Sequence, residues 1–199
     1  MKIFINLLKI NTMKKLATVL GAIVLGFAIV SCTKNPTEKI LNEVNNFFAQ
    51  AETKLAAIDN AGDLMNFINT FSEERNNFGE QLDKTYGLND KGLYKGLDAA
   101  GMESLMNAIS ERATEYNKVE YAKCGEIMEP FIARLEKAAK GLYELFQAGG
   151  EPDDNLVNDY LKGMEELAPY ADIVPEELAD RYEQVDNLMN EMFGEDEAE

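Results

Sequence analysis

The feature that most constrains the fold is a series of apolar stripes in which hydrophobic residues recur every three or four positions. The first stripe consists of Ile40, Leu41, Val44, Phe47, Phe48, Ala51 and Leu55. This spacing places its members on one face of a helix, and such a face has to be buried against a partner. The mature part of the sequence shows no alternation of apolar and polar residues typical of a half-buried strand. The chain is therefore expected to be all-α.

Five further stripes follow along the chain. They cover approximately residues 64–82, 102–116, 127–145, 156–164 and 178–192. The apolar phase is nearly kept between the stripes at 102–116 and 127–145, so one bent helix and two separate helices are both compatible with it. Because Pro130 lacks a backbone donor and crowds the carbonyl of Glu126, we favour a break between Lys123 and Pro130. The sequence predicts a single-domain bundle of five or six mostly antiparallel helices over residues 37–194.

Several helix ends are marked by the residue types that favour them. Asn35 is suited to cap the first helix, with Pro36 in the first helical position and Glu38 completing a capping box. Gly87 is suited to end the second helix in a left-handed conformation. The following segment, 88–96, is interpreted as a connection. Residues 195–199 are predicted to be an acidic, disordered tail.

Composition excludes several classes of function. The chain has 19 Lys and Arg against 36 Asp and Glu, a formal net charge of −17, and it has no His. The acidic balance argues against binding of nucleic acid, which needs a basic face. The absence of His removes Ser/His/Asp catalysis and His-ligated zinc. We expect no catalytic residue, no metal site and no cofactor, and we expect that the protein is not an enzyme.

Two sets of acidic residues are candidates for a functional site. A group near one helix start is interpreted as helix capping: it consists of Asp153, Asp154, Asn155 and Asp159. A second set could provide paired carboxylates for acid and base catalysis only if the fold buried some of them side by side. That set consists of Glu73, Glu74, Glu111, Glu165 and Glu166.

The first 31 residues differ sharply from the rest of the chain. They contain four lysines and no acid, which leaves a net charge of −21 on residues 32–199. Leu16–Val30 is an unbroken run of 15 apolar, small or Thr residues. As a helix it would reach only about 22 Å, which is short for a bilayer core of roughly 30 Å. Residues 1–31 are therefore predicted to be a secretory signal peptide that is removed, with Met1 or Met13 as its start.

The end of this leader carries a more specific pattern. Two aliphatic residues, a small residue and a cysteine follow one another in Ile29-Val30-Ser31-Cys32. The pattern resembles the lipobox of bacterial lipoproteins, and it stands in register after a basic region and an apolar run. The resemblance implies cleavage between Ser31 and Cys32, a diacylglyceryl group on the Cys32 thiol and acylation of the new amine. Two or more chains of this kind give stable anchoring in a membrane. The mature domain does not resemble any characterised family.

Two alternatives to the lipobox stay open, an ordinary signal peptide with an adjacent cysteine and an uncleaved anchor. If Cys32 carries lipid, Cys124 has no partner for a disulfide in the chain. Cys124 is interpreted as a small buried apolar residue. Gly141 and Gly163 lie inside predicted helices, where close helix contact would explain them.

These features predict a lipid-anchored protein of the bacterial cell envelope. Residues 32–36 would be a short tether to the membrane. Thr33, rather than Asp, follows the cysteine, and this resembles lipoproteins that are sorted to the outer membrane. The periplasmic face is preferred, and exposure on the cell surface is the alternative. We expect a non-enzymatic interaction or scaffold module that binds a protein or cell-wall partner. The alternative is a carrier or sensor of a small ligand held between helices.

Overall fold

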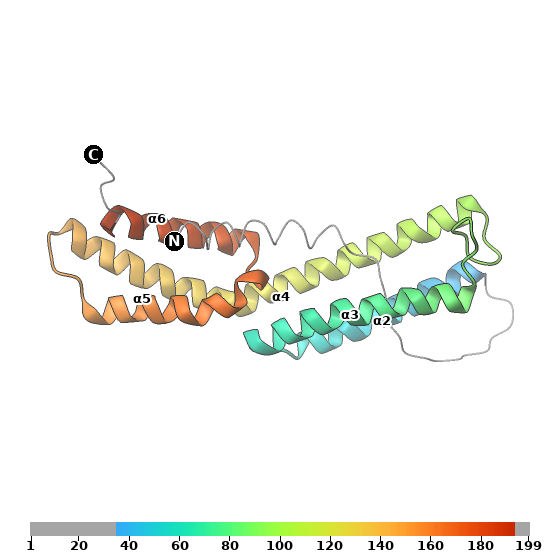
Figure 1. Cartoon of the computed structure of the whole chain (residues 1–199), viewed down its shortest axis with the longest axis horizontal. Coiled ribbons are helices and arrows are strands. Elements are labelled where there is room, and N and C mark those ends of the chain that lie inside the picture. The colour runs from blue at the N-terminus through green and yellow to red at the C-terminus, as the bar shows by residue number, and fades with distance from the viewer. Residues whose placement is uncertain (1–34, 194–199) are drawn as a thin grey trace. The chain divides into compact units, whose positions relative to one another are not determined.

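The computed structural model describes residues 35–193, and these residues form an all-α fold (Figure 1). Its helices are α2 (Pro36–Ala56), α3 (Ala61–Tyr86), α4 (Ala99–Gln147), α5 (Asp154–Leu167), the short 3-10 helix η1 (Ala168–Ile173) and α6 (Glu176–Phe193). The predicted helical bundle of five or six helices is confirmed, and the described residues contain no strand. The predicted signal peptide, the cleavage site, Cys32 and the acidic tail lie outside the described residues.

The helix ends predicted at Asn35, Pro36 and Gly87 are confirmed, whereas the part of Glu38 in a capping box stays a prediction. The Asn35 side chain accepts a hydrogen bond from the Thr37 amide at 3.2 Å, and Pro36 is the first residue of α2. Gly87 ends α3 with a φ of 64°. Asn35 thus satisfies a backbone N–H that the helix leaves unpaired at its start, and Gly87 lets the chain leave the helix at its end.

The predicted break between Lys123 and Pro130 is wrong, because α4 continues through both residues as one helix of 49 residues. Pro130 costs about 3 kcal/mol in a helix interior through its missing donor and its clash with the preceding turn. The apolar stripe stays in phase across it, since Ile127, Met128 and Ile132 are all buried. Burial of side chains of this size contributes about 1.5–3 kcal/mol each, which offsets the cost of the proline.

The described chain divides into two compact units, and the boundary falls within α4. We call residues 35–123 the N-terminal unit and residues 124–193 the C-terminal unit. Both units are helical. The single domain over residues 37–194 stays a prediction, because α4 contributes to both units.

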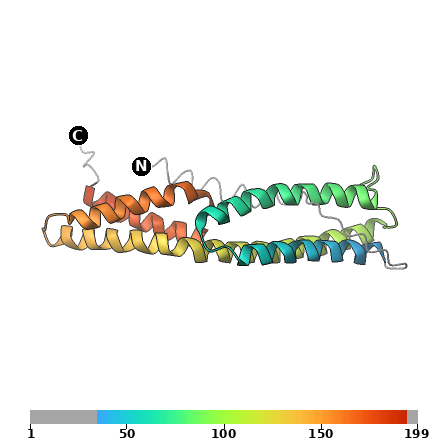
Figure 2. The ribbon, with the colours of Figure 1, turned by 90° about the horizontal axis from the view of Figure 1, so that it is seen from below.

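The N-terminal unit packs α2, α3 and the first part of α4 around an aromatic centre (Figures 1 and 2). The Phe71 and Tyr116 rings lie 4.6 Å apart between centroids, and the Phe48 and Tyr116 rings 5.3 Å. Two arginines cover the edges of this cluster. The Arg75 guanidinium lies 5.7 Å from the Phe71 ring centroid, and that of Arg112 lies 5.2 Å from the Phe48 centroid. Such cation–π contacts add to the burial of the rings.

The C-terminal unit packs the second part of α4 against α5 and α6. Its core consists of Cys124, Ile127, Met128, Ile132, Leu135, Ala138, Ala139, Leu142, Tyr160, Leu167, Ile173, Val174, Leu178, Tyr182, Val185, Met189 and Met192. The stripes predicted for 127–145 and 178–192 supply most of this set. No helix among residues 35–193 combines the length and apolarity needed to cross a bilayer.

Candidate functional site

The predicted lipidation site lies just before the first described helix. Cys32 and Ser31 fall outside the described residues, and α2 begins at Pro36 with Asn35 as its cap. Four residue steps separate Cys32 from Pro36, and an extended chain spans at most about 3.6 Å per step. The start of α2 therefore lies within roughly 15 Å of the Cys32 residue.

A loop closes the end of the N-terminal unit at which α2 begins. This loop, residues 87–98, joins α3 to α4, and Figure 1 shows it at the same end as the first turn of α2. We call it the end loop. Its backbone lies so close to α2 that a Cβ placed on Gly96 would be 3.4 Å from Cγ of Pro36. The end loop and the start of α2 thus form one surface.

The end loop holds its shape through its own hydrogen bonds. The Asn89 side chain accepts from the Lys91 amide at 2.9 Å and from the Leu93 amide at 3.1 Å. The Lys95 amide donates to the carbonyl of Tyr86 at 3.0 Å. Gly92 has a φ of 73°, in the left-handed region that glycine adopts without steric cost.

One tyrosine fastens the end loop to α3, and a second, at the end of α3, fastens that helix to α2. The Tyr94 hydroxyl donates to Asp83 of α3 at 2.7 Å, and the Tyr86 hydroxyl donates to Glu43 of α2 at 2.6 Å. The two rings lie 6.1 Å apart. Burial, and then the hydrogen bond to a carboxylate, raises the pKa of both hydroxyls well above the ordinary value for tyrosine. Both tyrosines therefore stay protonated as donors across the physiological range.

The solvent side of the end loop is balanced in charge and partly apolar. Within the end loop, Lys91 and Lys95 match Asp90 and Asp98 in number, whereas residues 32–199 together carry −21. Leu88 is 42% exposed although it is a large apolar residue. The predicted connection at 88–96 is confirmed. Its attachment to the helices was not predicted, although Tyr86 and Tyr94 flank closely spaced glycines.

The structure places the other residues singled out by the sequence in structural roles. Cys124 is buried, as predicted for a small apolar side chain. The Asp153 carboxylate caps α5 by accepting from the Asn155 amide at 2.8 Å, which confirms the capping interpretation for this residue. That Cys124 forms no disulfide stays a prediction, since Cys32 is outside the described residues.

The two glycines inside helices are confirmed as points of close helix contact. A Cβ on Gly141 of α4 would lie 2.9 Å from Leu156 of α5. Reciprocally, a Cβ on Gly163 of α5 would lie 2.8 Å from Leu135 of α4. Each helix therefore inserts a leucine where the other lacks a side chain.

The structure pairs two of the five candidate acids with cations rather than with one another. Glu74 lies 3.4 Å from Lys54 Nζ, and Glu166 pairs with Arg134. The remaining three, Glu73, Glu111 and Glu165, are exposed. Hydrogen bonding from Arg134 lowers the pKa of Glu166, so this acid is held as a carboxylate. Among the described residues, no group of three or more acidic or cysteine side chains could hold a metal ion.

Two groups of partly buried charges were missed by the sequence analysis. In the N-terminal unit, Glu120 interacts electrostatically with Tyr116 and with the Arg75 charge. Burial raises the pKa of Glu120, while Tyr116 and Arg75 oppose that shift. Arg112 Nη1 also lies 2.8 Å from Glu52 and so ties α4 to α2. Arg75 and Arg112 each lie three or four positions from a member of a predicted stripe. This spacing is only a weak sequence signal that they are partly buried.

In the C-terminal unit, Asp186 is 3% exposed and lies near two buried tyrosines. Its carboxylate accepts from Asn190 at 3.3 Å, and the Tyr182 hydroxyl lies 3.0 Å from Sδ of Met164. The Tyr160 hydroxyl has no hydrogen-bond partner among the described residues. Burial, together with the negative charge of Asp186, raises the pKa of Tyr160. This group therefore lies in the core of the C-terminal unit.

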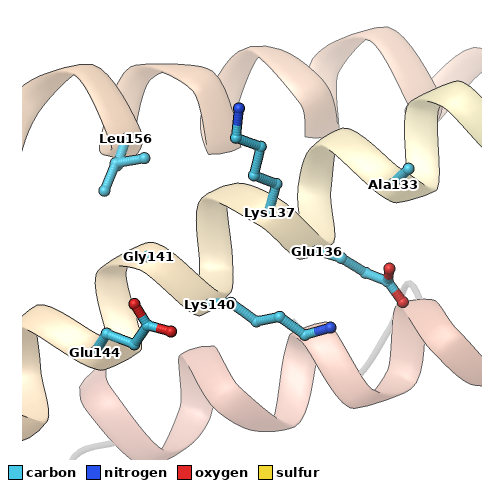
Figure 3. Close-up of a pocket in the computed structure, with 7 residues that line it drawn as sticks. All are labelled: Ala133, Glu136, Lys137, Lys140, Gly141, Glu144 and Leu156. Atoms are coloured by element: carbon cyan, nitrogen blue, oxygen red, sulfur yellow. The ribbon is translucent and has the colours of Figure 1, made fainter.

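A groove on the C-terminal unit has a volume of about 510 Å³ (Figure 3). It is lined by Ala133, Glu136, Lys137, Lys140, Gly141, Glu144 and Leu156. In Figure 3, Lys137 points to the side of α4 where Leu156 lies, and Glu136 and Lys140 point to the other side. The groove is open and bordered by both signs of charge. It therefore gives no support to the carrier alternative, which needs an enclosed apolar cavity.

No protein family matches the chain, and the chain has no significant similarity to a curated protein or to a solved structure. The helical body is thus not recognised as any characterised family.

Proposed function

We propose that this protein is a lipid-anchored component of the bacterial cell envelope that acts as a non-enzymatic interaction or scaffold module. The observation that carries the proposal is the basic and apolar leader ending in Ile29-Val30-Ser31-Cys32, with the capped start of α2 four residues later. The leader directs the chain to export and to lipidation at Cys32, and the helical body supplies the surface that binds a partner. The short segment between them leaves no room for another structured element.

The charge of the body indicates the kind of partner. A body with a net charge of −21 attracts cationic partners, does not repel neutral ones and repels acidic ones, over a Debye length of about 8 Å at physiological salt. We propose a protein or cell-wall partner, at the periplasmic face of the outer membrane. The use of Glu52, Glu136 and Glu166 in ion pairs supports a structural rather than a catalytic role for these acids.

The lipid anchor is tested by labelling with a clickable palmitate in a bacterial host that modifies lipoproteins. The native chain should incorporate the label and pellet with membranes, and Cys32→Ala should lose both properties. Cys124→Ala is the matched control, because Cys124 is the other cysteine of the chain and is buried in the helical body. Label that persists in Cys32→Ala would overturn the proposal.

The interaction role is tested by affinity capture from detergent-solubilised envelopes, with an unrelated lipoprotein of similar size as the control. Partners held by the acidic body should be released as salt rises, because screening weakens attraction between exposed charges. Capture of nothing beyond the control would count against the interaction role while leaving the anchor intact.

A further inference from the structure

We propose that the end loop, residues 87–98, is a membrane-contact surface that rests on phospholipid headgroups and holds the N-terminal unit end-on to the bilayer. This inference rests on the proposed lipidation of Cys32. It adds the part of the folded body that meets the membrane and the chemistry of what it meets.

The reach of the chain brings this end to the bilayer. The acyl groups on Cys32 would sit in the membrane, and Pro36 follows within roughly 15 Å. Gly96 of the end loop packs directly on Pro36, with 3.4 Å between the Cβ position of Gly96 and Cγ of Pro36. The end loop is therefore confined to the same distance from the membrane as the start of α2.

The direction of α2 takes the rest of the unit away from this end. A helix of 21 residues is about 31 Å long, so the turn between α2 and α3 lies at the far end of the unit. Figures 1 and 2 show this turn and the end loop at opposite ends of α3. The far turn, residues 57–60, carries Asp59 and no lysine, and Lys54 in the last turn of α2 is paired with Glu74. It is thus poorly suited to an anionic surface.

The chemistry of the end loop fits a headgroup layer. Its two lysines, Lys91 and Lys95, offset its two aspartates, Asp90 and Asp98, in a body that is otherwise strongly acidic. Lysines can keep their ammonium groups among phosphates while their stems lie along apolar material. Leu88 of the same loop is 42% exposed and offers an apolar side chain to the interface. An anionic bilayer therefore repels this end less than it repels the acidic sides of the helices.

The end loop presents these groups in a fixed arrangement. Tyr94 is buried and bonded to Asp83, Tyr86 is bonded to Glu43, and Asn89 organises the turn that follows Leu88. Because the loop is ordered by the protein itself, contact with the membrane does not have to order it first.

The test measures how close two ends of the lipidated protein lie to the bilayer. Full-length protein with Cys124→Ala is made with one new cysteine, Leu88→Cys in the end loop or Ala57→Cys at the far turn. Each is labelled with an environment-sensitive fluorophore after palmitate incorporation has been confirmed. The protein is placed in vesicles of phosphatidylethanolamine and phosphatidylglycerol that contain a lipid-bound quencher.

Strong quenching at position 88 and little at position 57 is the expected result. Equal quenching at both positions would show a unit lying flat, and no quenching at either would show a unit held away from the membrane. Both of these results would overturn the end-on contact while leaving the lipid anchor in place. Absence of palmitate would instead overturn the proposed function, and the inference with it.

A charge reversal separates contact from mere proximity. Lys91→Glu with Lys95→Glu should lower quenching at position 88 roughly twofold or more, because lysines near an anionic bilayer contribute directly to its attraction. Lys118→Glu with Lys162→Glu changes the net charge by the same amount elsewhere and should leave quenching at position 88 unchanged. Equal effects of the two pairs would overturn a specific role for the end loop.

Discussion

At the scale of single residues, buried side chains of the same type differ in whether their polar atoms form hydrogen bonds. Tyr94 and Tyr160 are both 6% exposed. The Tyr94 hydroxyl donates to the Asp83 carboxylate, whereas the Tyr160 hydroxyl has no partner among the described residues. A buried hydrogen bond to a charged group stabilises a fold, and a buried hydroxyl without one costs free energy.

Replacement of each tyrosine by phenylalanine should therefore give opposite results. Tyr94→Phe should lower the free energy of unfolding by about 1–2 kcal/mol through loss of the bond to Asp83. Tyr160→Phe should leave that free energy unchanged or raise it slightly. Urea unfolding of the leaderless chain, followed by circular dichroism, measures both values. Equal losses in the two variants would contradict the assignment of their hydroxyl environments.

Arg181 provides a pH-dependent contribution to stability. Its Nε and Nη2 each lie 2.9 Å from a Glu136 oxygen, and Nη1 lies 2.6 Å from Glu129. These hydrogen bonds lower the pKa of Glu136 below its ordinary value. A lowered folded-state pKa stabilises the fold above the unfolded-state pKa, and this stabilisation is lost as pH falls through the folded-state value.

Arg181→Gln should therefore destabilise the C-terminal unit by about 1 kcal/mol near pH 7, a value limited by the partial exposure of Arg181. The difference from the native chain should shrink as pH falls below the ordinary glutamate pKa of about 4.3, because the lowered pKa of Glu136 is then approached and its carboxylate becomes protonated. Lys84→Gln is the control, because Lys84 and Glu80 form an exposed pair with side chains 75% and 72% accessible. A difference between native chain and Arg181→Gln that did not depend on pH would contradict this account.

The residues that the sequence did not reveal are those whose role depends on a distant partner. Asp186 follows Leu178 and Tyr182 at steps of four, so helical spacing alone places it on the buried face. Its polar neighbours come from α5 as well as from its own helix, and no spacing within α6 predicts them. The Arg75 and Glu120 pair is similarly formed between α3 and α4.

At the scale of helices, the periodic stripes predicted which segments would be helical but not where neighbouring helices would join. At positions 127–145 the stripe correctly indicated a helix, whereas Pro130 wrongly indicated a break in it. The cost of one proline is local, whereas burial of the stripe extends along several turns of α4. Comparison of these magnitudes, rather than the presence of Pro130, would have predicted the continuous helix.

The crossing of α4 and α5 depends on two glycines in unequal surroundings. A Cβ at position 163 would lie 2.8 Å from Cδ2 and 3.2 Å from Cγ of Leu135, which is fully buried. A Cβ at position 141 would lie 2.9 Å from Cδ1 of Leu156, a half-buried residue on the open groove. Leu156 has space to turn away, and Leu135 does not.

Gly163→Ala should therefore lower the free energy of unfolding, because overpacking costs about 1–3 kcal/mol and the helix propensity of alanine recovers at most about 1 kcal/mol. Gly141→Ala should be close to neutral. Thermal unfolding of the two variants beside the native chain measures the difference. A larger loss for Gly141→Ala would show that the groove side of the crossing is the less adaptable one.

At the scale of the whole molecule, the lipid anchor and the charge of the body act against each other. The proposed lipid on Cys32 pulls the body to the membrane, while its charge of −21 disfavours an anionic surface. A tether of four residue steps leaves the start of α2 close to the surface, where the balanced charge of the end loop reduces the repulsion. The length of the tether and the charge of the end loop are therefore expected to determine together how close the body lies to the membrane.

Lengthening the tether should separate these two effects. Insertion of ten Gly and Ser residues after Thr33 adds a root-mean-square length of roughly 17 Å, which exceeds a Debye length of about 8 Å. The body then gains freedom to leave the surface while its lipid stays in the membrane. In anionic vesicles, palmitate incorporation should be unchanged, and quenching at position 88 should fall. High salt should restore part of the quenching, because screening removes the repulsion that drives the body outward. Quenching that stays at the native level at low salt would show that the end loop binds the membrane strongly enough to need no short tether.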